Sequence, residues 1–202
     1  YIYFKRFFDI SISLLGLIIS SPLFLVLKLI YLFGENKGPL IFKQKRVGKN
    51  GELFYIYKFR SMIVDAEKKL KSNKVLYQKY INNNYKLEPN EDPRITSLGR
   101  FLRATSLDEI PQLINVLEGS MSLVGPRPVV EDELEEYEGH ISKILSVRPG
   151  ITGYWQVSGR SNVGYPERVY IELDYIDKKS IKLDFYIFVK TIAMVLLRKG
   201  AY

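Results

Sequence analysis

The chain has 202 residues, of which 47% are hydrophobic, so it is long enough for one domain with a substantial core and too short for two. It contains no cysteine, which excludes disulfides, thiolate nucleophiles and cysteine-ligated metals, and its single histidine, His140, nearly excludes histidine chemistry. The net charge of +8 predicts an anionic partner, which could be nucleic acid, phospholipid headgroups or a phosphorylated small molecule.

These exclusions narrow the chemistry that the chain can perform. Any catalysis falls to carboxylates, lysine, arginine or tyrosine, and any metal would need oxygen ligands, as Mg²⁺ does. The first residue is Tyr1 rather than Met, which indicates a processed product or a piece of a longer protein.

Residues 10–33 form an apolar run that carries a single charge, Lys28. As a straight helix the run would be about 36 Å long, which is enough to cross a hydrocarbon core of about 30 Å. Pro22 in its middle leaves the Ile18 carbonyl without a partner, and the Ser20 and Ser21 hydroxyls can replace the lost donor. The sequence therefore predicts a membrane-embedded helix with a kink at Ser21 and Pro22.

Basic residues flank this run on both sides, whereas a spanning helix usually has a basic excess on one side only. The symmetry favours a helix that enters the membrane and returns to the same face, and a kinked spanning helix is the alternative. The aromatic and basic residues 1–8 suit a helix lying in the headgroup layer. The flanking cations are Lys5, Arg6, Lys37, Lys43, Lys45 and Arg46.

Residues 40–47 and 53–60 are rich in strand-forming side chains and are separated by a glycine-containing turn, which predicts a β-hairpin. Its cations fit a solvated face, or a contact with lipid phosphate beside an embedded segment. Residues 65–85 are polar and weakly periodic, so we expect a peripheral helix and loop without chemistry. The cations are Lys43, Lys45, Arg46, Lys58 and Arg60.

Two adjacent carboxylates, Asp108 and Glu109, precede Pro111. Because proline suits only the first turn of a helix and pushes Ile110 towards extended geometry, a helix over 113–118 should begin near Asp108 or Glu109. Its free N–H groups would keep Asp108 ionised and attract a phosphate. A plain N-cap role for Asp108 is the alternative. Arg103 lies on the preceding helical face, which points towards this pair.

Three arginines then occur beside rigid turns. Pro126 and Pro128 hold Arg127 in one orientation, which suits bidentate phosphate binding. Arg148 precedes a Pro-Gly turn, and Arg160 follows a glycine. We further expect an amphipathic surface helix over 131–145, a core position for Trp155, and an apolar helix over 184–198 that packs on the domain or lies on the membrane.

Six linked motifs, in order along the whole chain, resemble the bacterial sugar transferase family, the monotopic phosphoglycosyl transferases. This resemblance implies an α+β fold, with a re-entrant membrane helix-break-helix over residues 1–40 and a single catalytic unit over 41–202 on the cytoplasmic face of the bacterial inner membrane. The motifs are Lys5-Arg-Phe-Phe-Asp9, Ser21-Pro22, Tyr57-Lys-Phe-Arg-Ser-Met62, Ser106-Leu-Asp-Glu-Ile-Pro-Gln-Leu113, Gly125-Pro-Arg-Pro128 and Arg148-Pro-Gly-Ile-Thr-Gly153.

The resemblance also implies an activity, which is the first step of polysaccharide assembly. A carboxylate of the acidic pair attacks the β-phosphate of a UDP-sugar, UMP leaves, and undecaprenyl phosphate then takes the hexose 1-phosphate from the enzyme. Carboxylate attack on phosphorus needs a divalent cation and arginines to offset charge repulsion, and an accessible carboxylate at a water-membrane boundary. The longer insert over 64–92 resembles members that transfer galactose or glucose 1-phosphate and that carry extra membrane helices ahead of this domain.

The resemblance also implies roles for single residues. Asp108 is the expected nucleophile and Glu109 the expected Mg²⁺ ligand. Membrane lipid and a homodimeric partner are further expectations. Phosphate and nucleotide contacts are expected from Arg103, Arg127, Arg148 and Arg160, a lipid-phosphate contact from Lys58 or Arg60, and a weaker contribution from Asp174.

Two other functions fit parts of the sequence. A non-enzymatic adaptor that binds anionic lipid would explain the charge and residues 1–40, although not an acidic pair beside rigid arginines. A nucleic-acid binder is suggested by charge alone and leaves the apolar run without a role, so no nucleic-acid partner is expected.

Overall fold

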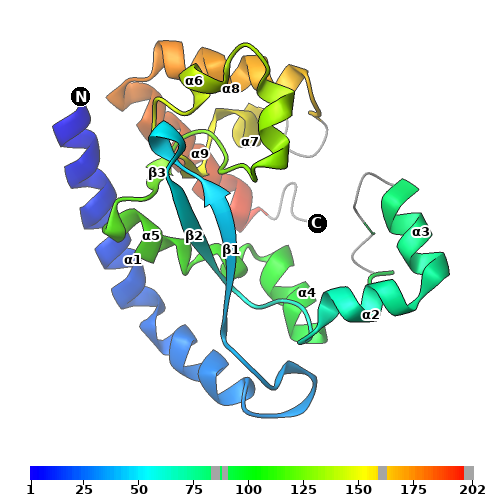
Figure 1. The fold of residues 1–202 in the computed structure, drawn as a ribbon. Coiled ribbons are helices and arrows are strands. Elements are labelled where there is room, and N and C mark those ends of the chain that lie inside the picture. Colours follow the sequence, from blue (N-terminus) through cyan, green and yellow to red (C-terminus); the bar gives the residue numbers. More distant parts are fainter. Residues whose placement is uncertain (83–86, 88–90, 159–162, 198–202) are drawn as a thin grey trace.

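The computed structural model describes residues 1–82, 87, 91–158 and 163–197. It confirms the α+β class, with helices around two small sheets (Figure 1). Longer elements alternate with short 3-10 turns, which are labelled η. In order they are α1 (Ile2–Ile30), η1 (Gly34–Asn36), β1 (Ile41–Val47), η2 (Lys49–Gly51), β2 (Leu53–Phe59), α2 (Ala66–Ser72), α3 (Lys74–Asn82), α4 (Ser97–Ala104), η3 (Leu107–Glu109), α5 (Gln112–Glu118), β3 (Ser122–Val124), η4 (Asp132–Tyr137), α6 (Ile141–Ile144), β4 (Gly150–Thr152), α7 (Tyr154–Ser158), α8 (Glu167–Lys178) and α9 (Ile181–Leu196).

Helix α1 runs unbroken through Pro22 and includes the residues expected to form a separate interfacial helix. The Ser21 hydroxyl donates to the Ile18 carbonyl at 2.8 Å, which confirms that it replaces the donor that Pro22 lacks. Figure 1 shows that α1 bends along its length. By length and composition α1 could cross a membrane, and most of its apolar side chains are exposed.

Charged residues in the first turns of α1 fasten it to the rest of the domain. Lys5 Nζ donates to the Asp184 carboxylate at 2.8 Å and to the Val124 carbonyl at 2.9 Å. Arg6 donates to the Val116 carbonyl at 2.6 Å, close to the end of α5. Because these two cations are engaged by protein groups, the symmetry of flanking charges carries less weight as evidence for a re-entrant helix.

Strands β1 and β2 pair antiparallel, with Ile41 opposite Phe59, so the predicted hairpin is confirmed. Helix α5 lies along the other edge of β2 through the Asn115 side chain. Its amide accepts a hydrogen bond from the Tyr57 N–H at 2.9 Å and donates to the Tyr55 carbonyl at 2.8 Å. Asn115 thereby satisfies backbone groups that an edge strand would otherwise leave open, and it fixes α5 beside the hairpin.

The short parallel strands β3 and β4 join the two proline-glycine motifs. A Cβ on Gly150 would lie 2.1 Å from the Gly125 nitrogen, so only glycine permits this approach. The Gly125 N–H donates to the Thr152 carbonyl at 2.9 Å, and the Gly150 N–H donates to the Pro126 carbonyl at 2.8 Å. The two loops therefore form one unit.

Two apolar clusters support the fold. The larger one surrounds β3 and includes Val116, Met121 and Ile187, and the smaller one joins the end of α1 to β2 and α4 through Leu27, Phe59 and Leu102. The expected surface helix over 131–145 is wrong, because Gly139 has a φ of 77° and separates η4 from α6. Trp155 is 8% exposed, as expected for a core residue.

Candidate active site

The acidic pair lies in the tight turn η3, not at the first residues of α5. Ser106 takes a left-handed conformation with φ of 57°, which starts the turn. Pro111 is the residue before α5, and Ile110 is helical at φ −53° and ψ −40°, so the expected extended geometry at Ile110 and the N-cap alternative for Asp108 are wrong. Leu107 and Ile110 pack against the smaller apolar cluster, and this packing outweighs the local preference of a residue before proline.

The expected accessible carboxylate is not found, because Asp108 is buried and only 9% exposed. The pKa of its carboxyl is raised to about 6, mainly by burial and also by the neighbouring Glu109 charge, while the Lys58 and Arg103 charges oppose this rise. The expectation that a helix N-terminus would hold Asp108 ionised is therefore wrong. At neutral pH the carboxylate form nevertheless predominates.

Glu109 forms the open side of the acidic pair, with its side chain 36% exposed. Lys58 Nζ lies 2.8 Å from its carboxylate and reaches it from β2. Partial burial would raise the pKa of Glu109, but the charge and hydrogen bond of Lys58, the charge of Arg127 and a hydrogen bond from Gln112 together hold it below its usual value. Asp108 and Glu109 thus have pKa values that are shifted in opposite directions by their surroundings.

Arg103 connects the hairpin to the acidic pair. Its Nε donates to the Ser61 hydroxyl at 2.8 Å, directly after β2. Its charge lowers the pKa of Asp108, so the guanidinium lies within electrostatic reach of that carboxylate. The structure thus brings Arg103, Lys58 and the two carboxylates together, although they come from separate stretches of the sequence.

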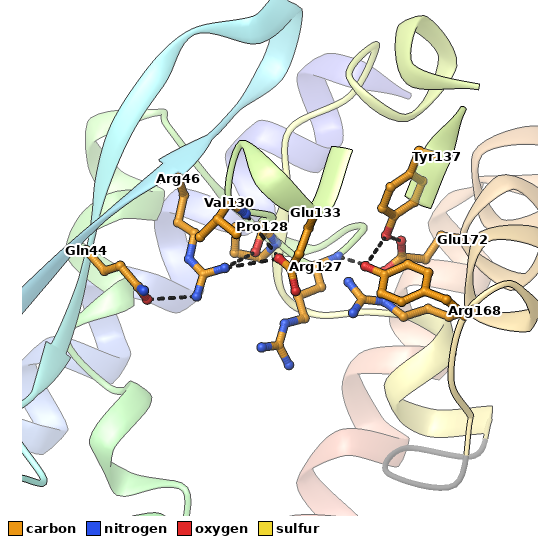
Figure 2. Close-up of polar contacts among 10 residues, drawn as sticks. Gln44, Arg46, Arg127, Pro128, Val130, Glu133, Tyr137, Arg168 and Glu172 are labelled. Carbon is orange, nitrogen blue, oxygen red and sulfur yellow. Dashed lines mark hydrogen bonds and ion pairs between the residues drawn. The ribbon is translucent and has the colours of Figure 1, made fainter. Parts of the chain in front are cut away.

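Arg127 is presented on the proline-flanked loop, as expected. Its backbone N–H donates to the buried Glu172 carboxylate at 3.1 Å, which holds the loop from α8. Its guanidinium extends away from the loop (Figure 2). Because the Arg127 charge lowers the pKa of Glu109, this guanidinium belongs to the same electrostatic site.

Two of the expected phosphate contacts instead have structural partners. Arg148 Nε donates to the Gly119 carbonyl at 2.6 Å, where α5 ends. Arg60 is 7% exposed and donates to the carbonyls of Pro39 and Met62, at 2.8 Å and 2.7 Å, and to that of Asn36. The geometry therefore gives no support to a lipid-phosphate contact by Arg60.

Two further predicted residues lie outside the group around the acidic pair. Asp174 lies on α8 and forms an ion pair with Lys178 at 2.7 Å, with both side chains open to solvent. Arg160 lies outside the described residues.

The sequence did not predict the residues that anchor the loop carrying Arg127. Glu172 and Arg168 are both buried and lie four residues apart on α8. This spacing on one helical face could have indicated an ion pair between Arg168 and Glu172, but not the contact of Glu172 with Arg127, which lies 45 residues earlier. We interpreted Arg46 as a cation that flanks the apolar run and belongs to the solvated or lipid-binding face of the hairpin, yet it reaches the loop through the Pro128 carbonyl at 3.3 Å.

The carboxylates fit a magnesium ion that is held jointly with substrate. In the part of the chain that the structure describes, no group of three or more Asp, Glu or His side chains could hold a metal ion. Mg²⁺ is commonly held by one or two carboxylates together with substrate phosphates and water. Glu109, with its lowered pKa and exposed side chain, supplies the right kind of oxygen for such a site.

Comparison with known proteins places the chain in a family. A sequence profile described as "Bacterial sugar transferase" matches residues 1–198. The chain is 47% identical over 99% of its length to the undecaprenyl-phosphate galactose phosphotransferase of Salmonella typhimurium, but covers only 42% of that protein. It is 39% identical over 98% of its length to the UDP-glucose:undecaprenyl-phosphate glucose-1-phosphate transferase of Escherichia coli, covering 41% of that protein.

Shorter relatives are matched almost completely. The exopolysaccharide production protein ExoY of Sinorhizobium fredii is 44% identical over 98% of this chain, which covers 88% of that protein. Because the profile covers nearly every residue, and the acidic pair, its lysine and the proline-flanked arginine all lie within it, the chain belongs to the bacterial sugar transferase family.

Proposed function

We propose that this chain transfers a hexose 1-phosphate from a UDP-sugar to undecaprenyl phosphate through a covalent intermediate on Asp108. The observation that carries this proposal is the acidic pair in a family member, with Lys58 at 2.8 Å from Glu109 and the charges of Arg103 and Arg127 on the same two carboxylates. The names of the Salmonella and Escherichia relatives support galactose or glucose as the sugar.

In the first step a carboxylate oxygen of Asp108 attacks the β-phosphorus of the donor. A bond forms between that oxygen and phosphorus, and the bond from phosphorus to the bridging oxygen breaks, so that UMP leaves with the electron pair. Lys58, Arg103 and Arg127 offset the negative charge that gathers in this transfer. A magnesium ion bound by Glu109 would add Lewis-acid stabilisation of the phosphate oxygens.

In the second step a phosphate oxygen of undecaprenyl phosphate attacks the same phosphorus. The bond to Asp108 breaks, and the products are the lipid diphosphate sugar and the free carboxylate. An acyl phosphate on the buried Asp108 would be shielded from water and so protected from hydrolysis before the lipid arrives.

We propose that α1 lies in the bacterial inner membrane and that the acidic pair works at its cytoplasmic face. The apolar exposed side chains of α1 and the packing of its C-terminal part beside η3 support this arrangement, since a lipid phosphate held at the headgroup level would be near Asp108. The curvature of α1 and the proline within it suit a helix that returns to the face it entered.

The experiment uses the full chain in lipid nanodiscs with Mg²⁺ and either UDP-galactose or UDP-glucose. Without undecaprenyl phosphate, the intact mass should increase by one hexose phosphate, and UMP should be released in about one equivalent. Asp108→Asn should show neither change, whereas Lys143→Gln, which removes an exposed cation on α6, should behave like the wild type. Sustained UMP release by Asp108→Asn would refute the nucleophile assignment.

A further inference from the structure

A second polar cluster is built around Glu172 (Figure 2). Glu172 is only 1% exposed. One of its oxygens accepts from the Arg127 N–H at 3.1 Å and from Arg168 Nε at 3.4 Å, and the other accepts from the Tyr137 hydroxyl. Because Arg127 and Arg168 share one carboxylate oxygen, the proline-flanked loop and α8 meet at this point.

Arg168 is buried and incompletely paired. It is 6% exposed, and its guanidinium lies over the rings of Trp155, at 4.7 Å from the ring centre, and Tyr165, at 5.0 Å. Its Nη2 has no hydrogen-bond partner within the described ranges. A buried guanidinium nitrogen without an acceptor is costly, so this atom indicates a missing acceptor.

Arg46 approaches the same cluster from β1. It donates to the Gln44 side chain at 2.7 Å and to the Glu133 carboxylate at 3.3 Å, and its buried Nε has no partner among the residues described. Burial lowers the pKa of Arg46, and the charges of Arg127 and Arg168 lower it further. The Arg127 and Arg168 guanidinium groups are therefore close enough to that of Arg46 to repel it.

The charge balance of this cluster calls for an anion. Arg46 is paired with Glu133 and Arg168 with Glu172, whereas the Arg127 guanidinium has no ion pair with either carboxylate. Two buried donors, Arg46 Nε and Arg168 Nη2, have no partner among the described residues. We propose that Arg46, Arg127 and Arg168 form a binding site for the phosphate of a nucleoside monophosphate. This inference rests on the proposed function, and it assigns these arginines to UMP, the leaving group of the first step.

The position of Arg127 favours the nucleotide phosphate over the phosphate that is transferred. The Arg127 charge acts both on Glu109 and on Arg46, so its guanidinium is the member of this cluster that is also within electrostatic reach of the acidic pair. A donor whose β-phosphorus reaches Asp108 would extend its α-phosphate towards Arg127. Arg46 and Arg168 would then hold UMP after the bond breaks, and Glu172 would act as a positioning residue.

The single tryptophan of the chain offers a direct probe, because the Arg168 guanidinium is stacked on the Trp155 ring. Titration of the full chain in nanodiscs with UMP should change its tryptophan fluorescence in a saturable way. Uridine should have no effect, and inorganic phosphate and a short-chain polyprenyl phosphate should bind at least about 10-fold more weakly than UMP. Arg46→Gln should weaken UMP binding by roughly 10-fold or more, because a charged hydrogen bond is lost.

Control variants separate this inference from the proposed function. Lys143→Gln, which changes an exposed cation on α6, should bind UMP as the wild type does. Thermal unfolding of Arg46→Gln checks that the variant is folded, and the exposed Arg127→Gln provides a second variant that does not disturb the core. If UMP affinity is unchanged in both arginine variants, the phosphate site is refuted while the transferase proposal stands. If UMP binds as expected but no sugar phosphate is transferred, the transferase proposal fails and the phosphate site stands.

Discussion

Replacing Asp108 by asparagine should stabilise the protein while it abolishes transfer. Burial raises the pKa of Asp108 from 3.8 to about 6, so the ionised carboxylate is less favourable in the folded chain than in the unfolded one. A shift of about two pKa units corresponds to roughly 3 kcal/mol. Above pH 6, the neutral amide should therefore raise the free energy of unfolding by up to that amount, which is a rise of roughly 6–12 °C in Tm for a chain of this size.

The sign of the pH dependence makes the test specific. Because the folded chain holds the Asp108 proton more tightly, the contribution of Asp108 to the stability of the wild type falls as pH rises from about 4 to about 6. The advantage of Asp108→Asn should be full at pH 7.5 and should vanish near pH 4. Thermal unfolding of both proteins, free of Mg²⁺ and donor, measures the difference at the two pH values. A variant that is no more stable at pH 7.5, or equally stabilised at both pH values, would contradict the reasoning.

Three further results should follow from the same contacts. Lys58→Met removes a charge that lowers the pKa of Asp108, so the midpoint of the pH-rate profile should move above pH 6 and transfer should fall more at pH 6 than at pH 8. Glu172→Gln should destabilise the fold by about 3–5 kcal/mol, since it leaves a buried arginine uncompensated, whereas the exposed Asp174→Asn should cost less than about 1 kcal/mol by thermal unfolding. In a chain without cysteine, single cysteines placed in the first turn of α1 and in the loop after it should react with an impermeant maleimide from the same side of the membrane, and reaction from opposite sides would establish a spanning helix.

Sequence patterns predicted local structure correctly where interactions between residues close in sequence determine it. Alternating strand-forming residues around a glycine turn gave the hairpin, and Gly119 ended α5 where expected. The Ser21 hydroxyl replaces the backbone donor that Pro22 lacks, as predicted, because both the missing N–H and the hydroxyl belong to the same helical turn as the Ile18 carbonyl. The prolines on both sides of Arg127 likewise act locally, and Arg127 is exposed on its loop as predicted.

Some errors arose where distant packing opposed a local preference. Ile110 is helical although it precedes proline, because it and Leu107 fill an apolar cluster with the end of α1. The same packing buries Asp108 and raises the pKa of its carboxyl, whereas local sequence indicated an ionised residue at a helix end. The residues next to Asp108 along the chain do not indicate which distant residues pack against it in the folded protein.

The amino-acid sequence by itself determined the chemical inventory of this protein: carboxylates and arginines in place of cysteine and histidine, an excess of positive charge, and an apolar helix that could enter a membrane. Only the tertiary structure decided which of those groups meet. It joined Lys58 to Glu109 and tied Glu172 to the Arg127 loop, and it committed Arg60 and Arg148 to backbone carbonyls. The reason is physical, because hydrogen bonds and Coulomb interactions act over a few ångströms, and folding alone determines which side chains come that close.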